Sequence, residues 1–146
     1  MCKTFPVLCT FISLNNAISQ PDKTNTMKIL IAEDEPIMLK IIEARLRKDG
    51  HQVIVTSDGK QAMEQISLQD PDMIITDIMM PFSSGLEIVG MVKQGQQRKV
   101  PVIILSAMGQ ENVVLEAFNL GADDYITKPF SPNELSMRVK RLSKAS

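Results

Sequence analysis

The sequence predicts an α/β fold, in which a doubly wound, five-stranded parallel sheet is covered on both faces by five helices. Three observations favour this prediction. Five short apolar runs of three to five residues alternate along the chain with segments of helical periodicity. The runs are almost continuously apolar, which is typical of strands buried on both faces. Strict alternation of strands and helices, joined by right-handed crossovers, produces parallel strands with helices on both sides.

The first strand is predicted at residues 28–32, which read Lys-Ile-Leu-Ile-Ala. The first helix follows at 36–49, because Pro36 suits the first turn of a helix and Gly50 suits its end. Its apolar residues recur every three or four positions and are expected to face the core; they are Leu39, Ile42 and Leu46.

The next four elements repeat this alternation. A strand rich in valine and isoleucine is predicted at 52–56, and a helix is predicted at 60–68. The inward-facing residues of this helix are Ala62, Met63 and Ile66. A third strand at 73–76 ends at Asp77, and a third helix runs over 85–94. The inward-facing residues of the third helix are Leu86, Ile88, Val89 and Val92.

The last part of the chain completes the pattern. The fourth strand is predicted at 102–105, and the fourth helix at 111–120, where Gly121 stops it. A short fifth strand follows at 125–127.

The final helix carries a strong start signal. Ser131 can cap its N-terminus, Pro132 suits its first position, and Glu134 completes a capping box. Its buried stripe is expected to comprise Leu135, Val139 and Leu142.

Length and composition indicate one domain with a short leader. The chain has 146 residues, a size that suits a single compact domain, which we place at 27–146 after a flexible leader at 1–26. A secretory signal peptide is the alternative for the leader. The basic region before its apolar stretch is a single lysine, Lys3, and the apolar stretch is short and interrupted; both favour a flexible leader or translation begun upstream of a start at Met27.

Charge and cysteine content limit the function classes. With 16 basic and 17 acidic side chains, the net charge of −1 provides no broad basic field, so we expect no direct nucleic-acid binding. Cys2 and Cys9 both lie in the leader, which excludes a disulfide framework and fits a reducing cytoplasm. No apolar run approaches the ~20 residues that span a bilayer, so no membrane partner is expected.

Polar residues that carry chemistry follow four of the five predicted strands. They are Glu33 and Asp34 after the first strand, Asp77 after the third, Ser106 after the fourth and Lys128 after the fifth. In doubly wound sheets, ligands bind outside the carboxyl ends of the strands, where the strand order reverses. Three carboxylates crowded together need a nearby cation to stay ionised, and hard oxygen donors favour Mg²⁺ over zinc. A carboxylate beside such a metal can attack a phosphoryl group.

Four motifs succeed one another at these strand ends. They are Glu33-Asp34, then Asp77-Ile78-Met79-Met80-Pro81 with Gly85, then Ser106-Ala107, and finally Asp123-Asp124-Tyr125-Ile126-Thr127-Lys128-Pro129-Phe130. This series resembles the receiver domain of bacterial two-component response regulators, from residue 27 to about residue 143. The resemblance implies a flavodoxin-like, CheY-like fold with strand order 2-1-3-4-5. It also implies a signalling phosphoacceptor rather than an enzyme, which assists only its own phosphorylation and dephosphorylation.

The resemblance assigns roles to the site residues. Asp77 would accept the phosphoryl group from a phosphohistidine of a sensor kinase or a phosphotransfer protein. Glu33, Asp34, the Asp77 carboxylate and the main-chain carbonyl of Met79 would hold Mg²⁺, and Lys128 would contact the phosphoryl group. Glu33 stands where many family members have aspartate, and its additional methylene decides whether it reaches the metal directly or through water.

Further roles concern the conformational switch. The Ser106 hydroxyl would move toward the new phosphoryl group, and Tyr125 would turn inward into the vacated space. The Lys128-Pro129 peptide bond is expected to be cis. The switch would change the surface formed by helix 111–120, strand 125–127 and the final helix, and this surface would control an output domain or an effector protein.

Whether the chain forms a homodimer through that same surface stays an open question. Asp123, Asp124, Arg138 and Lys140 resemble the charged set of OmpR-type dimers. Three positions of helix 111–120 where that set has charges carry uncharged residues instead, namely Val113, Val114 and Asn119.

Three other functions compete with this interpretation. A phosphatase of the haloacid-dehalogenase type would need a second aspartate two residues after Asp77, where the chain has Met79. A flavodoxin-like electron carrier would need a phosphate-binding loop after the first strand, where Glu33 and Asp34 would repel the phosphate. A pseudo-receiver would bind partners without phosphorylation, but the acceptor, the acidic pair and the lysine are all present.

Overall fold

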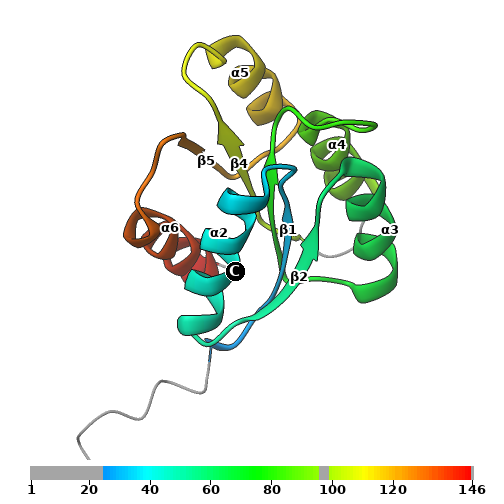
Figure 1. Ribbon diagram of the computed structural model, residues 1–146. Helices are drawn as coiled ribbons and strands as arrows, with labels where there is room; N and C mark the ends of the chain where they lie inside the picture. Colours follow the sequence, from blue (N-terminus) through cyan, green and yellow to red (C-terminus); the bar gives the residue numbers. More distant parts are fainter. Residues whose placement is uncertain (1–24, 96–98, 146) are drawn as a thin grey trace, which may run out of the picture.

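The computed structural model describes residues 25–95 and 99–145, so all but the last two residues of the predicted leader lie outside the described residues. In chain order the elements are β1 (Lys28–Ala32), α2 (Pro36–Lys48), β2 (Gln52–Thr56), α3 (Gly59–Gln69), β3 (Met73–Asp77), α4 (Gly85–Gly95), β4 (Val102–Ser106), α5 (Glu111–Asn119), β5 (Asp124–Thr127) and α6 (Pro132–Ala145) (Figure 1). Every predicted strand and helix is present, and no bound differs from the prediction by more than one residue.

The five strands form one parallel sheet in the order β2-β1-β3-β4-β5. This is the predicted order, in which the chain starts inside the sheet and adds strands first toward one edge and then toward the other. From β1 the chain moves to β2 at one edge, then crosses back to β3 and continues to β5 at the other edge. The direction therefore reverses between β1 and β3, and their carboxyl ends flank the crevice in which such sheets bind ligands.

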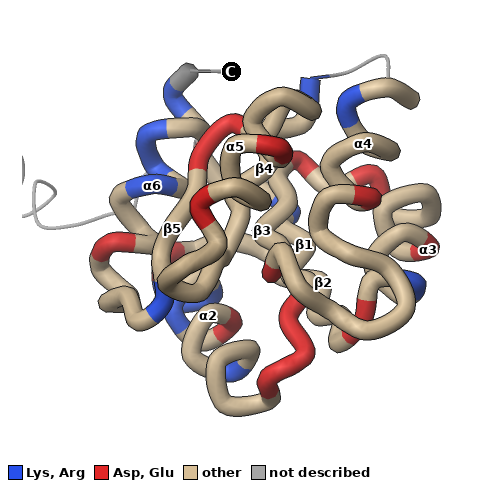
Figure 2. The backbone as a smooth tube through the Cα atoms, turned by 90° about the horizontal axis from the view of Figure 1, so that it is seen from above, with Lys and Arg blue, Asp and Glu red and all other residues tan. Residues whose placement is uncertain are grey.

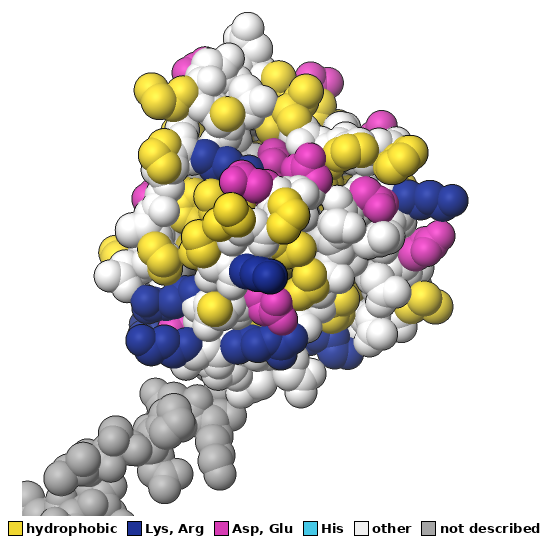
Figure 3. Space-filling model, viewed as in Figure 1, with side chains coloured by type: hydrophobic (Ala, Val, Ile, Leu, Met, Phe, Trp, Pro, Cys, Tyr) yellow, Lys and Arg dark blue, Asp and Glu magenta, His cyan; other side chains and the backbone are white. Residues whose placement is uncertain are grey.

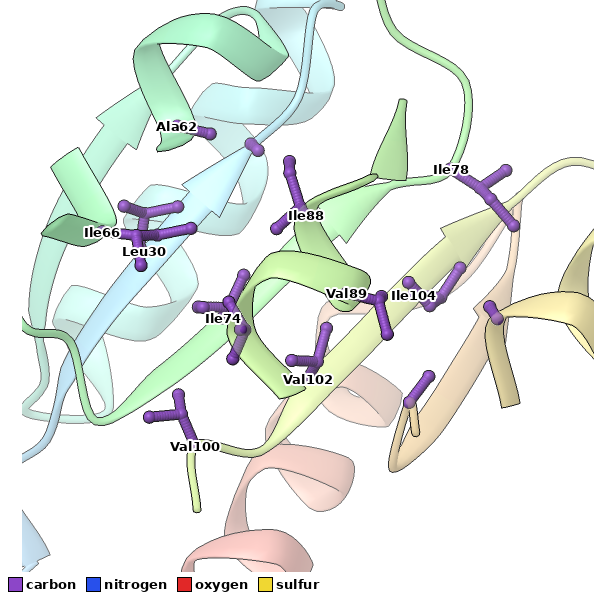
Figure 4. Packing of buried hydrophobic residues seen from close by; sticks show 14 of the residues in the cluster. Leu30, Ala62, Ile66, Ile74, Ile78, Ile88, Val89, Val100, Val102 and Ile104 are labelled. Carbon is purple, nitrogen blue, oxygen red and sulfur yellow. The ribbon is translucent and has the colours of Figure 1, made fainter. Parts of the chain in front are cut away.

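Two apolar clusters hold the layers together because alternate residues of each strand point to opposite faces. On one face α2 and α6 cover the sheet, with Ile42, Leu46, Leu135 and Val139 against Ile29, Ile31, Ile75 and Ile103. On the other face α3, α4 and α5 pack against Leu30, Ile74, Val102 and Ile104 (Figure 4). Fully burying one such side chain stabilises the fold by about 1.5–3 kcal/mol. The two clusters therefore hold the strands in their positions, and with them the loops that follow the strands.

Local signals explain where the helices begin and end. Asp58 accepts a 2.8 Å hydrogen bond from the Gln61 amide, which starts α3 one residue earlier than predicted. Ser131 likewise accepts from the Glu134 amide at 3.2 Å, as the predicted cap requires. The Glu134 carboxylate, however, is bound by Arg138 at 3.2 Å, so this helix shows the serine half of the capping box.

None of the helices in the described parts of the chain combines the length and the apolar character that crossing a membrane requires.

His51 makes the stability of the fold depend on pH. Burial lowers the pKa of His51, although the nearby Asp49 charge opposes this, and its Nδ1 accepts a hydrogen bond from the Met27 amide at 3.4 Å. The unfolded chain therefore binds a proton at His51 more readily than the folded chain does. The contribution of His51 to the free energy of unfolding is therefore fully present above the ordinary histidine pKa of 6.5, and it is lost as the pH falls below that value.

We expect the parent to lose more stability than His51→Gln when the pH is lowered through this range, as measured by urea unfolding. Because both proteins share every other titrating group, the difference between them isolates His51. Equal losses in the two proteins would contradict the prediction.

Candidate functional site

Three carboxylates meet where β1 and β3 end. Asp77 is the last residue of β3 and is 8% exposed, whereas Glu33 directly follows β1 and is fully buried. Asp34 is exposed. One carboxylate oxygen from each of the three lies within 4.8 Å of the others. Seen from above, the acidic stretch between β1 and α2 lies beside the carboxyl ends of the central strands (Figure 2).

Lys128 joins two of these carboxylates. Its Nζ donates to Glu33 Oε2 at 2.7 Å and to Asp77 Oδ2 at 2.8 Å. The backbone places it, because the Lys128 amide donates to the Ser106 carbonyl at 2.7 Å and thereby prolongs the pairing of β4 and β5. The Lys128–Pro129 peptide bond is cis. A residue from the end of the chain is thus held against residues from its beginning.

Backbone amides fix the other oxygen of each carboxylate. The Glu35 amide donates to Glu33 Oε1 at 3.0 Å, and the Met79 amide donates to Asp77 Oδ1 at 3.1 Å. Each carboxylate is therefore oriented from two sides before any ligand binds. In the described residues, no hydrogen bond or ion pair holds Asp34, so its carboxylate stays available to a ligand.

Burial and charge act against each other in this cluster. Burial raises the pKa of Glu33 above its ordinary value, and the Asp77 charge adds to this, while Lys128 and the Glu35 amide oppose it. Burial by itself would lower the pKa of Lys128. The hydrogen bonds and charges of Asp77 and Glu33 outweigh burial, so the pKa of Lys128 is raised and the amine stays positive. The negative charges are thus only partly compensated, which favours binding of a further cation.

Gly85 closes the loop that follows Asp77. Its amide donates to the Ile78 carbonyl at 3.0 Å. A Cβ at this position would lie 2.5 Å from the Asp77 carbonyl oxygen and 2.8 Å from Ile78 Cα, closer than any side chain tolerates. Only glycine allows α4 to start this close to Asp77, which explains the glycine in the second motif.

The donor set suits Mg²⁺. All the candidate ligands are oxygens, the carboxylates lie close together and carry excess negative charge, and the exposure of Asp34 leaves one side open to water and phosphate. Among the described residues, no histidine or cysteine, the donors that zinc prefers, belongs to the cluster.

We expect Mg²⁺ to stabilise the folded chain, because it binds a site that exists only in the folded state. At a hundred times its dissociation constant the gain is about 2.7 kcal/mol, measurable as a shift of the unfolding midpoint against NaCl of equal ionic strength. Asp34→Asn should reduce the shift without harming the fold, since Asp34 is exposed. An unfolding midpoint that does not respond to Mg²⁺ would contradict the prediction that these oxygen donors bind the ion.

Ser106 and Tyr125 both line a cavity of about 290 Å³ between α5 and β5. Ser106 ends β4 and is 2% exposed, and no hydrogen bond from its hydroxyl reaches another described residue. The Tyr125 ring is 41% exposed and lies edge-on to Phe118, with 5.7 Å between the ring centres. The cavity therefore offers space for a different position of this ring.

Two features of the site neighbourhood do not follow from the motifs. Asp124 is 5% exposed and accepts from Arg138 at 2.8 Å and from Arg141 at 2.7 Å, and Asp123 pairs with Lys93 at 2.7 Å. These charges, which resembled a dimer interface, are thus satisfied within the chain. Strand β2 lies at the edge of the sheet, as expected, but it ends next to the cluster, because the Thr56 carbonyl accepts a 3.2 Å hydrogen bond from the Glu33 amide.

Comparison with known proteins agrees with this geometry. A family model described as the response regulator receiver domain matches residues 29–140. PhoP of Bacillus subtilis, an alkaline phosphatase synthesis transcriptional regulatory protein, is 37% identical over 119 residues, covering 82% of this chain and 49% of PhoP. The response regulator SaeR of Staphylococcus epidermidis is 44% identical over 114 residues, covering 78% of this chain and 49% of SaeR. The chain spans about half the length of these curated relatives.

Solved structures share the fold. The receiver domain of the Francisella response regulator 1452 has a TM-score of 0.75 and 36% identity, covering 82% of this chain and 98% of that one. The receiver domain of a histidine kinase from Syntrophus aciditrophicus has a TM-score of 0.75 and 35% identity, with 82% and 92% covered.

Proposed function

Since the chain belongs to the family of response regulator receiver domains, we propose that Asp77 is its phosphoacceptor. The observation that carries this proposal is the contact of one lysine amine with two buried carboxylates from separate strands. Lys128 reaches both Glu33 and Asp77, and Asp34 completes the acidic group. The haloacid-dehalogenase alternative is not favoured, because the site has no aspartate two residues after Asp77.

Phosphorylation at this site is an in-line displacement. An oxygen of the Asp77 carboxylate attacks phosphorus, the bond to the donor's histidine nitrogen breaks, and an acyl phosphate forms. Glu33, Asp34, Asp77 and the Met79 carbonyl would hold Mg²⁺, which supplies positive charge against the phosphoryl oxygens. Lys128 supplies a second positive charge, and the Met79 amide keeps the Asp77 carboxylate oriented.

The Ser106 hydroxyl connects the phosphorylated site to the surface. It has no partner among the described residues and lies at the end of the strand next to β3, so it is free to donate to a phosphoryl oxygen. Its movement opens space beside the α5–β5 cavity, into which Tyr125 turns. One local charge change thus biases two packings of the surface formed by α5, β5 and α6.

The family supports a proposal for the partners and the location of the chain. We assign the phosphoryl donor to a sensor histidine kinase or a phosphotransfer protein, and the target of the switch to an output domain or an effector protein. A homodimer through α5, β5 and α6 remains one form of that output. We place the chain in the cytoplasm, with residues 1–26 as a leader and 27–146 as the receiver, acting as a signalling phosphoacceptor and without direct nucleic-acid contacts.

The proposal is tested by incubating the chain with acetyl phosphate and Mg²⁺ and measuring its intact mass. We expect the mass of one phosphoryl group to be added, and none when EDTA removes the metal. Turnover of a chromogenic phosphomonoester, with no stable protein adduct, would instead support a phosphatase. No adduct and no turnover would support a pseudo-receiver and overturn the proposal.

A further inference from the structure

Phe82 stands out among the apolar residues of the described chain. Its side chain is 86% exposed, more than that of any other large hydrophobic residue described. It lies in the segment between β3 and α4, five residues after Asp77. An aromatic ring left in water forgoes the free energy of burial, so its position needs a separate reason.

The backbone at Phe82 is also unusual. Its φ is 70°, in the left-handed region that bulky residues avoid. The Ser83 amide donates to the Pro81 carbonyl at 2.9 Å, which closes a three-residue γ-turn around Phe82. With a positive φ at its centre, this is the rarer and more strained kind of γ-turn. Strained backbone of this kind concentrates at functional sites, where the surrounding structure maintains it.

The structure around the turn maintains it. Gly59, at the start of α3, lies so close to the Ser83 carbonyl that a Cβ would overlap it. At the other end, Gly85 is fixed against the Asp77 carbonyl. The turn is thus clamped between α3 and the phosphoacceptor strand, and the ring is held in solvent by a constrained segment.

Chain connectivity places Phe82 beside the phosphoacceptor. Phe82 is three residues from Gly85, so its Cα lies within about 11 Å of the Cα of Gly85, which itself touches Asp77. Two further apolar side chains belong to loops at the same edge of the sheet. Met79 is 57% exposed and Met108 is 79% exposed. We call Met79, Phe82 and Met108 the apolar collar. Figure 3 shows hydrophobic side chains beside the acidic group at the upper end of β1.

We propose that the apolar collar, with Phe82 as its anchor, docks an apolar surface on the protein that delivers the phosphoryl group. This inference rests on the proposed function and adds a residue that selects the donor. A macromolecule that brings a phosphorus atom into bonding distance of Asp77 must cover the loops around it, and its surface therefore meets the collar. Acetyl phosphate is small enough to reach Asp77 without covering Phe82.

This division between donors defines the experiment. Phosphoryl uptake is measured by intact mass for the parent, Phe82→Asn and Phe82→Leu, first with acetyl phosphate and then with a protein donor. The protein donor is the autophosphorylated sensor kinase, from a purified panel, that labels the parent fastest. Asparagine tolerates the positive φ and removes the ring, whereas leucine keeps an apolar side chain. Leu68→Gln is the matched control, since Leu68 is 77% exposed on α3 and lies outside the collar.

We expect Phe82→Asn to lower the rate from the protein donor by about tenfold or more and to leave the rate from acetyl phosphate unchanged. Phe82→Leu should lose less, and Leu68→Gln should match the parent with both donors. The unfolding midpoint of Phe82→Asn should equal or exceed that of the parent, because the strained residue is replaced by one that accepts its backbone.

Several results would overturn the inference while leaving the proposed function intact. They are an equal fall with both donors, no fall with either donor, or no kinase that labels the parent faster than acetyl phosphate does. A parent that dimerises and a Phe82→Asn variant that does not, in size-exclusion chromatography, would make a second copy of the chain the occupant. Failure of acetyl phosphate to label the parent would contradict the proposed function itself.

Discussion

Replacing Asp77 with asparagine is expected to abolish phosphorylation of the chain by acetyl phosphate and Mg²⁺. The amide has the size and shape of the carboxylate but lacks the anionic oxygen that the proposed reaction requires, and it also lacks the charge that Lys128 contacts at 2.8 Å. No neighbouring carboxylate is equivalent, because Glu33 is fully buried and Asp34 lacks the orientation that the Met79 amide gives Asp77. Intact mass should show one phosphoryl group on the parent and none on the variant.

The matched control for this substitution is Asp70→Asn. Asp70 follows α3 with a φ of 47°, a conformation that asparagine adopts readily, and it is exposed. This variant should take up one phosphoryl group as the parent does. A phosphoryl group on Asp77→Asn would place the acceptor elsewhere and would refute the assignment of Asp77.

Replacing Lys128 with methionine is expected to destabilise the fold by about 3–5 kcal/mol in the absence of divalent cations. The substitution keeps the length of the side chain but removes the amine that pairs with both Glu33 and Asp77, of which Glu33 is fully buried. Removing one partner of a buried ion pair leaves an uncompensated charge in a poorly solvated place. Urea unfolding in EDTA measures the loss, and added Mg²⁺ should recover part of it.

Lys93→Met provides the comparison. Lys93 also pairs with an aspartate, but Asp123 is 34% exposed and solvent screens the pair. Lys93 Nζ also donates to the Val100 carbonyl at 2.8 Å, so the total loss should stay at about 1–2 kcal/mol. Equal losses for the two variants would show that burial of the Lys128 pair carries no special cost. With acetyl phosphate, Lys128→Met should also be phosphorylated on the order of a hundredfold more slowly, since one charge that stabilises the transferred group is missing.

Much of the fold and of the site could be predicted because the relevant signals are local. Apolar runs such as Ile29 to Ala32 and helix signals such as Pro36 state which segments are strands and helices, and the bounds differ by at most one residue. Parallel strands then put their carboxyl ends at one edge of the sheet. This geometry alone predicted that Glu33, Asp34, Asp77 and Lys128 would meet, and the structure brings them together.

Other features depend on contacts between distant segments. Asp124 reads as a surface charge in the sequence, yet it is buried and pairs with two arginines of α6. The Tyr125 ring packs edge-on against Phe118 of α5. The cap of α6 uses Ser131, while the Glu134 carboxylate pairs with Arg138. Several partners can satisfy each of these side chains, and the sequence does not state which partner lies nearest.

The sequence by itself determined the order of strands and helices, the polar residues at the strand ends and therefore the place of the site, because periodicity and capping act within a few residues. The tertiary structure alone decided which atoms touch. Glu33 and Lys128 are 95 residues apart and meet at 2.7 Å, and Phe82 is held in water by a turn that α3 and Asp77 clamp. Such contacts arise only when the packed sheet brings separate loops together, and no local pattern encodes that distance.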